Sequence, residues 1–311
     1  MEDSSLTVIF PAYNEEITIY ECLMEYHSIF PLSTFIVVDN NSEDETSKQA
    51  RLFFDQTQHQ GVVIKEYRRG KGYALSKGLT YVNSKYFLLT DSDLTYSAKD
   101  AGKLYDYAIR NQLDMAVGNR INGGMYATSG SRKGHMTGNR LISLLITKSF
   151  KYEIGDALSG LRVLSNQLVK NYPALVSGFE VETDLTIFAI AYGYNVDEIP
   201  IEYRKRPEGS ESKLNTFTDG IKIFKTIFNL YRHYKPLQFF SILGAIFITL
   251  SVFFGLPVIS QYIESGFIDK MPSAILATGL AMLSAISFHL GIALDGIKHH
   301  TRIILNVIQK K

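Results

Sequence analysis

Two long stretches without a charged side chain dominate the C-terminal part of the sequence. The first extends over residues 236–263 and the second over residues 271–294, with a short charged link between them. As a helix, each stretch is long enough to cross the hydrocarbon core of a bilayer, which is about 30 Å thick. Because a backbone in lipid must satisfy its own hydrogen bonds, we expect both stretches to be helical. The sequence therefore predicts a transmembrane helical hairpin at residues 236–296.

Basic residues flank this hairpin on both sides. They are Arg232, His233 and Lys235 before it, and Lys298, Arg302, Lys310 and Lys311 after it. Cytoplasmic loops of membrane proteins carry an excess of Lys and Arg, so both ends of the hairpin are expected in the cytoplasm. We therefore expect a multi-pass protein of the inner (plasma) membrane whose large N-terminal region is cytoplasmic.

The hairpin divides the chain into four predicted parts. They are a globular cytoplasmic domain at residues 1–216, an amphipathic helix at 217–235, the hairpin at 236–296 and a basic cytoplasmic tail at 297–311. The amphipathic helix gathers Ile221, Phe224, Phe228 and Tyr231 on one face. Such a face is typical of a helix that lies in the membrane interface, and it also suits packing against the globular domain. The adjacent membrane span favours the interface.

Residues 1–216 alternate short apolar runs with stretches of helical pattern. The runs are LTVIF, FIVVD, VVIKEY, YFLLTD and DMAVG. This alternation predicts an α/β fold with a mostly parallel sheet flanked by helices, in which ligands bind at the carboxyl ends of the strands. Ser42 and Glu45 form a capping-box pattern, which predicts a helix start beside a strand end at Asp39 and Asn40.

Charge and cysteine content exclude several classes of function. The formal net charge is +1 and no long Lys/Arg tract stands apart from balancing acidic residues, so no nucleic-acid partner is expected. Cys22 is the only cysteine, which excludes an intrachain disulfide and a thiolate zinc cluster and favours a reducing compartment. Glycines in the hairpin would allow close helix contacts and self-association into a homo-oligomer.

The segment YFLLTDSDLT ends an apolar strand with two carboxylates, Asp91 and Asp93, one residue apart. Strand alternation turns both side chains to the same side. Two converging carboxylates repel each other unless a hard cation joins them, and Mg²⁺ or Mn²⁺ together with diphosphate oxygens would do so. The alternative is a solvated acidic turn, because an isolated Asp-x-Asp is common.

Several motifs occur in the order and spacing seen in family 2 inverting glycosyltransferases. They are PAYNEE at 11–16, VVDNNSEDET at 37–46, RGKGYAL at 69–75, DSDL at 91–94 and GNR at 118–120. Three further motifs, DALSGLR at 156–162, FEVETDL at 179–185 and RPEGSESKLN at 206–215, resemble the branch that acts on polyprenyl phosphates. That branch contains dolichyl-phosphate mannose synthases and bacterial undecaprenyl-phosphate glycosyltransferases. The resemblance covers the whole chain and implies a GT-A fold, a nucleotide sugar as donor and a divalent metal, Mg²⁺ or Mn²⁺.

The resemblance also assigns roles to individual residues. Nucleotide binding is assigned to Pro11, Tyr13, Glu15, Asp39, Asn40, Lys71 and Asp91. Catalytic roles are assigned to Asp91, Asp93, Asp156, Arg206 and Lys213, with Asp91 and Asp93 as metal ligands. The acceptor phosphate is assigned to Arg120, Arg140 and Ser143, and a sugar hydroxyl to Glu182.

Some of these assignments have alternatives. Asp156 either orients the sugar, acts as a base or only forms a turn, and Glu182 could simply begin a helix. Arg206 and Lys213 suit the leaving diphosphate, but anionic lipid headgroups would attract them too. Arg140 could be a surface residue of an amphipathic helix. Thr95 stands where many relatives carry Gln beside the metal, so a hydroxyl or water would have to substitute there.

These features together predict inverting transfer of a sugar from a UDP- or GDP-linked donor to a polyprenyl phosphate at the cytoplasmic membrane face. Such a phosphate is largely ionised and nucleophilic at neutral pH, so the enzyme needs no strong general base. A membrane glycosyltransferase with another lipid acceptor is one alternative, and a non-catalytic sugar-nucleotide sensor or flippase accessory is another. Processive polysaccharide synthases of this family normally carry Gln-x-x-Arg-Trp, and the chain contains no Trp.

Overall fold

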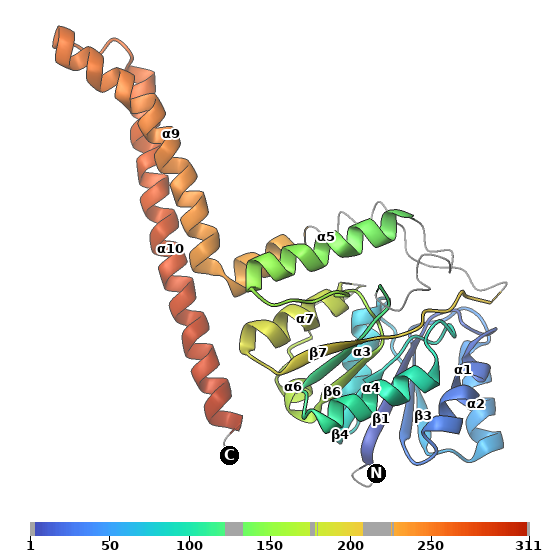
Figure 1. Cartoon of the computed structure of the whole chain (residues 1–311). Coiled ribbons are helices and arrows are strands. Elements are labelled where there is room, and N and C mark those ends of the chain that lie inside the picture. The colour runs from blue at the N-terminus through green and yellow to red at the C-terminus, as the bar shows by residue number, and fades with distance from the viewer. Residues whose placement is uncertain are drawn as a thin grey trace. The chain divides into compact units, whose positions relative to one another are not determined.

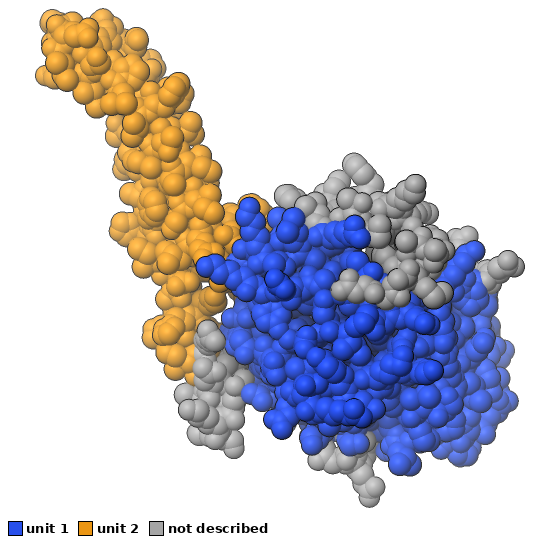
Figure 2. All heavy atoms as spheres, viewed as in Figure 1, with its two compact units in different colours: residues 1–227 blue, residues 228–311 orange. Residues whose placement is uncertain are grey.

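The computed structural model describes residues 4–121, 133–174, 178, 180–207, 225 and 227–309. The chain divides into two compact units, residues 1–227 and 228–311, which Figure 2 shows in different colours. The first unit contains β1 to β7 and α1 to α7, and the second contains the two longest helices, α9 and α10 (Figure 1). Lys213 and residues 217–224 and 226 of the predicted helix at 217–235 lie outside the described residues.

A seven-stranded, mostly parallel sheet forms the centre of the first unit. Its strands are β1 (Ser4–Ala12), β2 (Thr34–Asp39), β3 (Gly61–Lys65), β4 (Ser84–Leu89), β5 (Met115–Asn119), β6 (Arg162–Ser165) and β7 (Val196–Pro200). In space they are ordered β3-β2-β1-β4-β6-β5-β7. Only β6 runs antiparallel to its neighbours, β4 and β5. This sheet confirms the predicted α/β fold.

The five apolar runs of the sequence correspond to β1 through β5, whereas β6 and β7 have no counterpart among them. β6 has only four residues, RVLS, and it begins with an arginine. β7 has the sequence VDEIP, and only Val196 at its start is buried. Neither strand carries the continuous apolar run on which a sequence-based strand assignment depends.

Helices connect the strands and cover the sheet. They are α1 (Ile19–Ile29), α2 (Thr46–Thr57), α3 (Lys71–Tyr81), α4 (Ala98–Arg110), α5 (Lys133–Phe150), α6 (Asn166–Asn171) and α7 (Val181–Tyr192). Buried side chains of α1, α2 and α4 share one core with Val8 and Phe10 of β1. Ile9 points to the opposite face, where α3 approaches so closely that a Cβ on Gly78 would lie 2.7 Å from the Ile9 side chain.

The start of α2 differs from the prediction. β2 ends at Asp39 as expected, but the helix begins at Thr46, and its N-cap residue Glu45 makes no side-chain capping bond. The backbone N–H of Thr46 donates to Asp44 instead. Ser42 accepts a hydrogen bond from the backbone N–H of Asn14, so it joins this loop to the end of β1. The capping-box interpretation of Ser42 and Glu45 was therefore wrong.

The second unit contains α9 (Pro236–Ser265) and α10 (Met271–Gln309). Both helices are long and apolar enough to cross a membrane, and most of their apolar surface is exposed. They pack against each other through small residues: a Cβ on Gly244 would lie 2.8 Å from the Phe288 ring. The hydroxyl of Ser251 donates to the carbonyl of Ala277, and that of Ser284 to the carbonyl of Gly244. These contacts are typical of helices that associate in lipid.

Candidate active site

The carboxyl ends of the parallel strands meet at one edge of the sheet. Because β6 is antiparallel, its first residue Arg162 lies at the same edge, where it pairs with Leu89 of β4 and Val117 of β5. The loops after β1, β2, β4 and β5 and the loop before β6 therefore converge. The strand order also reverses at β1, because β2 and β3 lie on one side of it and β4 lies on the other. Open α/β sheets bind their ligands at such a switch point.

Asp91 follows β4 and lies beside Lys71, whose side chain is 13% exposed. Lys71, the first residue of α3, places its Nζ atom 2.5 Å from Asp91 Oδ1 and 2.6 Å from Glu182 Oε1 of α7. Burial alone would raise the pKa of Asp91, but the ammonium of Lys71, together with the charges of Arg206 and Arg120, holds that pKa below its usual value. The same two carboxylates overcome the effect of burial on Lys71 and raise its pKa, so this lysine stays charged.

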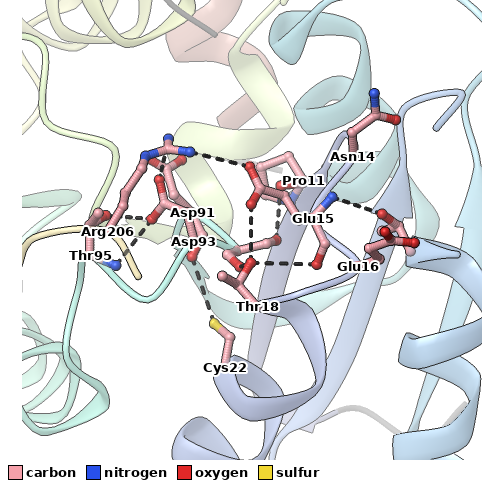
Figure 3. A network of polar contacts seen from close by, with 12 residues as sticks. Pro11, Asn14, Glu15, Glu16, Thr18, Cys22, Asp91, Asp93, Thr95 and Arg206 are labelled. Atoms are coloured by element: carbon pink, nitrogen blue, oxygen red, sulfur yellow. Dashed lines mark hydrogen bonds and ion pairs between the residues drawn. The ribbon is translucent and has the colours of Figure 1, made fainter. Parts of the chain in front are cut away.

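Asp93 is the second carboxylate at this edge, and Figure 3 shows its surroundings. Its Oδ1 atom accepts hydrogen bonds from the backbone and the hydroxyl of Thr95, and its Oδ2 atom forms an ion pair with Arg206. Burial and the neighbouring Asp91 raise the pKa of Asp93 above its usual value, which Arg206 only partly offsets. Thr95 therefore orients Asp93.

Arg206 has a second carboxylate partner. Its Nη1 atom lies 3.4 Å from Oε1 of Glu15, and Glu15 Oε2 accepts a hydrogen bond from the Thr18 hydroxyl. That hydroxyl also lies 2.8 Å from the carbonyl of Ser92, between the two aspartates. Glu15 is almost completely buried. It was assigned to the nucleotide, and the structure places it in the same network as Asp93 (Figure 3).

The other residues assigned to the nucleotide surround the ends of β1 and β2. Asp39 is buried and accepts hydrogen bonds from the Ser42 backbone and the Ser47 hydroxyl. Asn40 bonds to the carbonyl of Arg68 and to the N–H of Gly70, so it positions the loop that leads to Lys71.

Tyr13 and Pro11 lie on the β1 side of this region. The guanidinium carbon of Arg69 lies 5.4 Å from the centre of the Tyr13 ring. The carbonyl of Pro11 accepts a hydrogen bond from the Ser92 hydroxyl, which ties the end of β1 to the Asp-x-Asp segment. An aromatic ring with a neighbouring guanidinium can stack on a planar base.

Arg120, which was assigned to the acceptor phosphate, and Asp156, which was assigned a catalytic role, form a buried ion pair. Arg120 follows β5, and its Nε and Nη2 atoms lie 2.7 and 2.9 Å from the two carboxylate oxygens of Asp156. Asn139 of α5 donates a further bond to Asp156. Burial alone would raise the pKa of Asp156, but Arg120 and these hydrogen bonds hold it below its usual value. A carboxylate in this state is a weak base, and it suits fixing the guanidinium of Arg120.

Arg140 and Ser143 of α5 differ in their environment. Ser143 is buried, donates to the carbonyl of Gly155 and accepts from the N–H of Ala157, whereas Arg140 is exposed. Ser143 therefore holds the turn that contains Asp156.

Sequence reasoning missed Glu198 of β7, which holds the same turn from the sheet. Its Oε1 atom accepts hydrogen bonds from Asn119 and from the N–H of Gly155, and its Oε2 atom accepts from the N–H of Asp156. Burial raises its pKa. The segment VDEIP contains two adjacent charged residues in a short strand, and only the pairing of β7 with β5 brings Glu198 beside the turn.

Arg162 was also missed as a separate residue, although it belongs to the DALSGLR motif. Its side chain is completely buried and donates to the carbonyls of Ala157 and Ser159 and to the hydroxyl of Thr186 in α7. These bonds join the turn before β6 to the helix that carries Glu182. The only sequence signal for such a role is an arginine directly before the apolar pair Val163 and Leu164.

The residues at the β4 end fit a divalent cation. Asp91 and Asp93 offer hard oxygen ligands, and a Cβ on Gly160 would lie 2.8 Å from Asp91 Oδ2, so only glycine leaves this carboxylate its space. Among the described residues, no group of three or more His, Cys, Asp or Glu side chains could hold a metal alone. Mg²⁺ commonly takes only one or two carboxylates and completes its shell with phosphate oxygens and water.

The family model of "Glycosyl transferase family 2" matches residues 7–173, more than half of the chain. The chain belongs to this family. It is therefore a glycosyltransferase, as its motifs predicted. The matched part of this glycosyltransferase extends from β1 to the end of α6 and includes Asp91, Asp93, Arg120 and Asp156.

Comparison with individual proteins agrees with this family. An uncharacterized protein of Shigella flexneri is 45% identical over 137 residues, which are 44% of this chain and 84% of that protein. A dolichyl-phosphate hexose transferase of Haloferax volcanii is 28% identical over 71% of this chain and 92% of its own length. The solved structure of glucosyl-3-phosphoglycerate synthase from Mycobacterium tuberculosis with Mn²⁺, uridine diphosphate and phosphoglyceric acid has a TM-score of 0.59 at 19% identity, over 73% of this chain and 78% of that one. At that identity the likeness shows the fold, a GT-A fold.

Proposed function

We propose that this glycosyltransferase transfers a sugar from a UDP- or GDP-linked donor to the phosphate of a polyprenyl phosphate, with inversion at the anomeric carbon. The main supporting observation is the pair Asp91 and Asp93 at the switch point of the sheet, where Asp91 contacts Lys71 and Asp93 contacts Arg206. Arg120 follows β5 at the same edge of the sheet. The dolichyl-phosphate hexose transferase of Haloferax volcanii supports the acceptor class.

On the donor side, Asp91 and Asp93 would hold Mg²⁺ or Mn²⁺, and the ion would supply positive charge to the leaving diphosphate. The Mn²⁺ and uridine diphosphate in the solved neighbour support this assignment. Lys71 and Arg206 lie beside the same carboxylates and add fixed positive charge. We assign Tyr13, Asp39 and Asn40 to the nucleoside end, because they surround the adjacent ends of β1 and β2.

On the acceptor side, we assign Arg120 to the phosphate. A phosphate oxygen forms the bond to the anomeric carbon while the bond from that carbon to the diphosphate breaks, and the electron pair leaves with the nucleoside diphosphate. No proton has to move, because the acceptor phosphate is largely ionised at neutral pH. Asp156 then holds Arg120 in place, and fixed charges provide most of the rate enhancement.

We further propose that α9 and α10 anchor the enzyme in the inner membrane with its catalytic unit in the cytoplasm. The length and apolar surface of both helices support the anchor, and the basic flanks support the orientation. Residues 227–234 are helical, and we assign this segment to the membrane interface. A polyprenyl phosphate stays in the bilayer while its phosphate reaches the surface, so such an anchor brings enzyme and acceptor together.

The test uses purified full-length protein with undecaprenyl phosphate, Mn²⁺ and a panel of UDP- and GDP-linked sugars. Mass spectrometry of the lipid fraction should show a polyprenyl-phosphate monosaccharide with one donor. Transfer to a lipid hydroxyl, but to no lipid phosphate, would contradict the acceptor assignment. Nucleotide binding without any sugar transfer to lipid would contradict the proposed reaction.

A further inference from the structure

The site contains two ion-pair triads, in each of which one cation lies between two carboxylates. In one, Lys71 lies between Asp91 and Glu182, and in the other, Arg206 lies between Asp93 and Glu15 (Figure 3 shows the second). In each triad, the cation contacts one carboxylate of the Asp-x-Asp segment, which is suited to a metal, and one carboxylate from elsewhere in the fold. Glu15 precedes α1 and Glu182 belongs to α7.

Three of the four carboxylates in these ion-pair triads are almost completely withdrawn from solvent. The exposed fractions of the side chains are 7% for Glu182, 9% for Glu15 and 3% for Asp93. A buried carboxylate without a partner costs several kcal/mol, so each needs a cation whether or not a metal is bound. Lys71 and Arg206 meet this need in the present arrangement.

A divalent ion on Asp91 and Asp93 would compete with both cations for the same oxygens. Counted as ionised, the four carboxylates carry −4 and the two cations +2, so the cluster has a net charge of −2. One divalent ion would neutralise that charge. Lys71 and Arg206 need not leave the site, because Glu182 and Glu15 continue to pair with them.

We propose that Glu15 and Glu182 are positioning residues that retain Arg206 and Lys71 in the site when a divalent ion displaces these cations from Asp93 and Asp91. This inference rests on the metal role within the proposed function. It has a specific consequence for Arg206: the cation stays beside the departing diphosphate at the moment when the metal occupies Asp93. Glu15 then acts on metal binding through Arg206.

The experiment measures Mn²⁺ binding to the full-length protein in detergent, without donor or acceptor, from the electron paramagnetic resonance signal of free Mn²⁺. Arg206→Gln removes a competitor for Asp93, so Mn²⁺ should bind about three- to tenfold more tightly, as expected for side chains in contact. Glu15→Gln leaves Arg206 with Asp93 as its main partner, and Mn²⁺ should bind more weakly by about the same factor.

The double variant distinguishes action through Arg206 from the direct effect of a carboxylate charge. If Glu15 acts through Arg206, Glu15→Gln should have almost no effect in the Arg206→Gln background. An equal effect of Glu15→Gln in both backgrounds would overturn the inference. Glu16→Gln is the matched control, because the carboxylate of Glu16 binds the N–H of Glu45 instead of Arg206. It should leave Mn²⁺ affinity nearly unchanged.

The triad of Asp91, Lys71 and Glu182 gives an independent double-mutant cycle if one of these variants fails to fold. Lys71→Met should tighten Mn²⁺ binding and Glu182→Gln should weaken it, and the effect of Glu182→Gln should vanish in the Lys71→Met background. If the effects of the two single variants on Mn²⁺ affinity simply add in the double variant, while the wild type binds Mn²⁺ normally, this inference is overturned and the metal role remains. If the wild type binds no Mn²⁺ and transfers sugar in excess EDTA, the metal role and this inference both fail.

Discussion

At the scale of single residues, Asp93 combines burial, a nearby carboxylate and an arginine partner. Its side chain is only 3% exposed and touches Arg206 and Thr95, and burial together with Asp91 raises its pKa. A carboxylate in this position is costly for the folded state unless a cation is present. The geometry therefore favours a functional role for Asp93 over a role in stability.

Asp93→Asn should lower the turnover number at least about 100-fold, the usual scale for removing one fixed charge that stabilises a transition state. The isosteric amide keeps the hydrogen bond from Thr95, so thermal unfolding should change little. Steady-state kinetics with saturating donor, together with unfolding curves, check both expectations. Full turnover by this variant, or by the wild type in excess EDTA, would show that the reaction does not depend on a metal at Asp93.

His59 gives a residue-scale prediction about pH. Its Nδ1 atom lies 2.8 Å from Nδ1 of His27, and its ring packs against Phe35. Burial and the neighbouring His27 lower the pKa of His59 to about 4 from an ordinary value of 6.5. Between these two values the unfolded chain binds the proton and the folded chain does not, so stability falls as pH falls through this window.

From pH 7 to pH 5, this histidine should lower the free energy of unfolding by about 1–2 kcal/mol. The variant His59→Phe, which keeps an aromatic ring, should lack that part of the pH dependence. Denaturant unfolding of both proteins across this range measures the difference. Parallel stability curves for the two proteins would mean that His59 is not held neutral in the folded state.

At the scale of elements, β7 and α5 hold the turn before β6 from two sides. Glu198 accepts N–H bonds from Gly155 and Asp156, and Ser143 bonds to Gly155 and Ala157. Through Asp156, the turn determines where the guanidinium of Arg120 lies. The antiparallel direction of β6 makes this possible, because it brings the turn to the edge where the parallel strands end.

Glu198→Gln replaces one accepting oxygen with a donor that faces the N–H groups of the turn. The free energy of unfolding should fall by about 1–3 kcal/mol, the cost of leaving a buried polar group unpaired. If Arg120 binds the acceptor phosphate, KM for the acceptor should rise more than KM for the donor. Glu202→Gln is the control, because Glu202 lies two residues after β7 and is exposed. Equal changes in both KM values would indicate a general loss of structure.

At the scale of the whole molecule, the two compact units have different kinds of surface. Residues 1–227 enclose a core of buried apolar side chains, whereas α9 and α10 expose most of theirs. Full burial of one large apolar side chain contributes about 1.5–3 kcal/mol, so the exposed apolar surface of α9 and α10 would be stabilised in lipid. The site residues described above all belong to the first unit.

Deletion of residues 236–311 should leave nucleotide and Mn²⁺ binding intact and impair transfer to a long polyprenyl phosphate in membranes. Loss of the anchor removes the high local concentration of acceptor, so the defect should be at least about 100-fold there. It should be much smaller with a short, detergent-soluble prenyl phosphate. Equal losses with both acceptors, while nucleotide binding is preserved, would mean that the hairpin forms part of the catalytic site.

The sequence by itself determined the parts of this protein that depend on local pattern. Short apolar runs identified the strands β1 to β5, long uncharged stretches identified the two apolar helices, and ordered motifs identified the family and the Asp-x-Asp segment. These features could be predicted because neighbouring residues in the chain carry the whole signal. The charged strand β7 and the four-residue β6 carried too little of it.

Only the tertiary structure decided which charges meet. Arg206 pairs with Glu15 and Asp93, which lie far from it in the sequence, and Arg120 pairs with Asp156 near the other end of the long connection between β5 and β6. These contacts arise because β6 runs antiparallel and because the strand order reverses at β1. No local pattern records such pairings, since they depend on the free energy of burying several distant charges together.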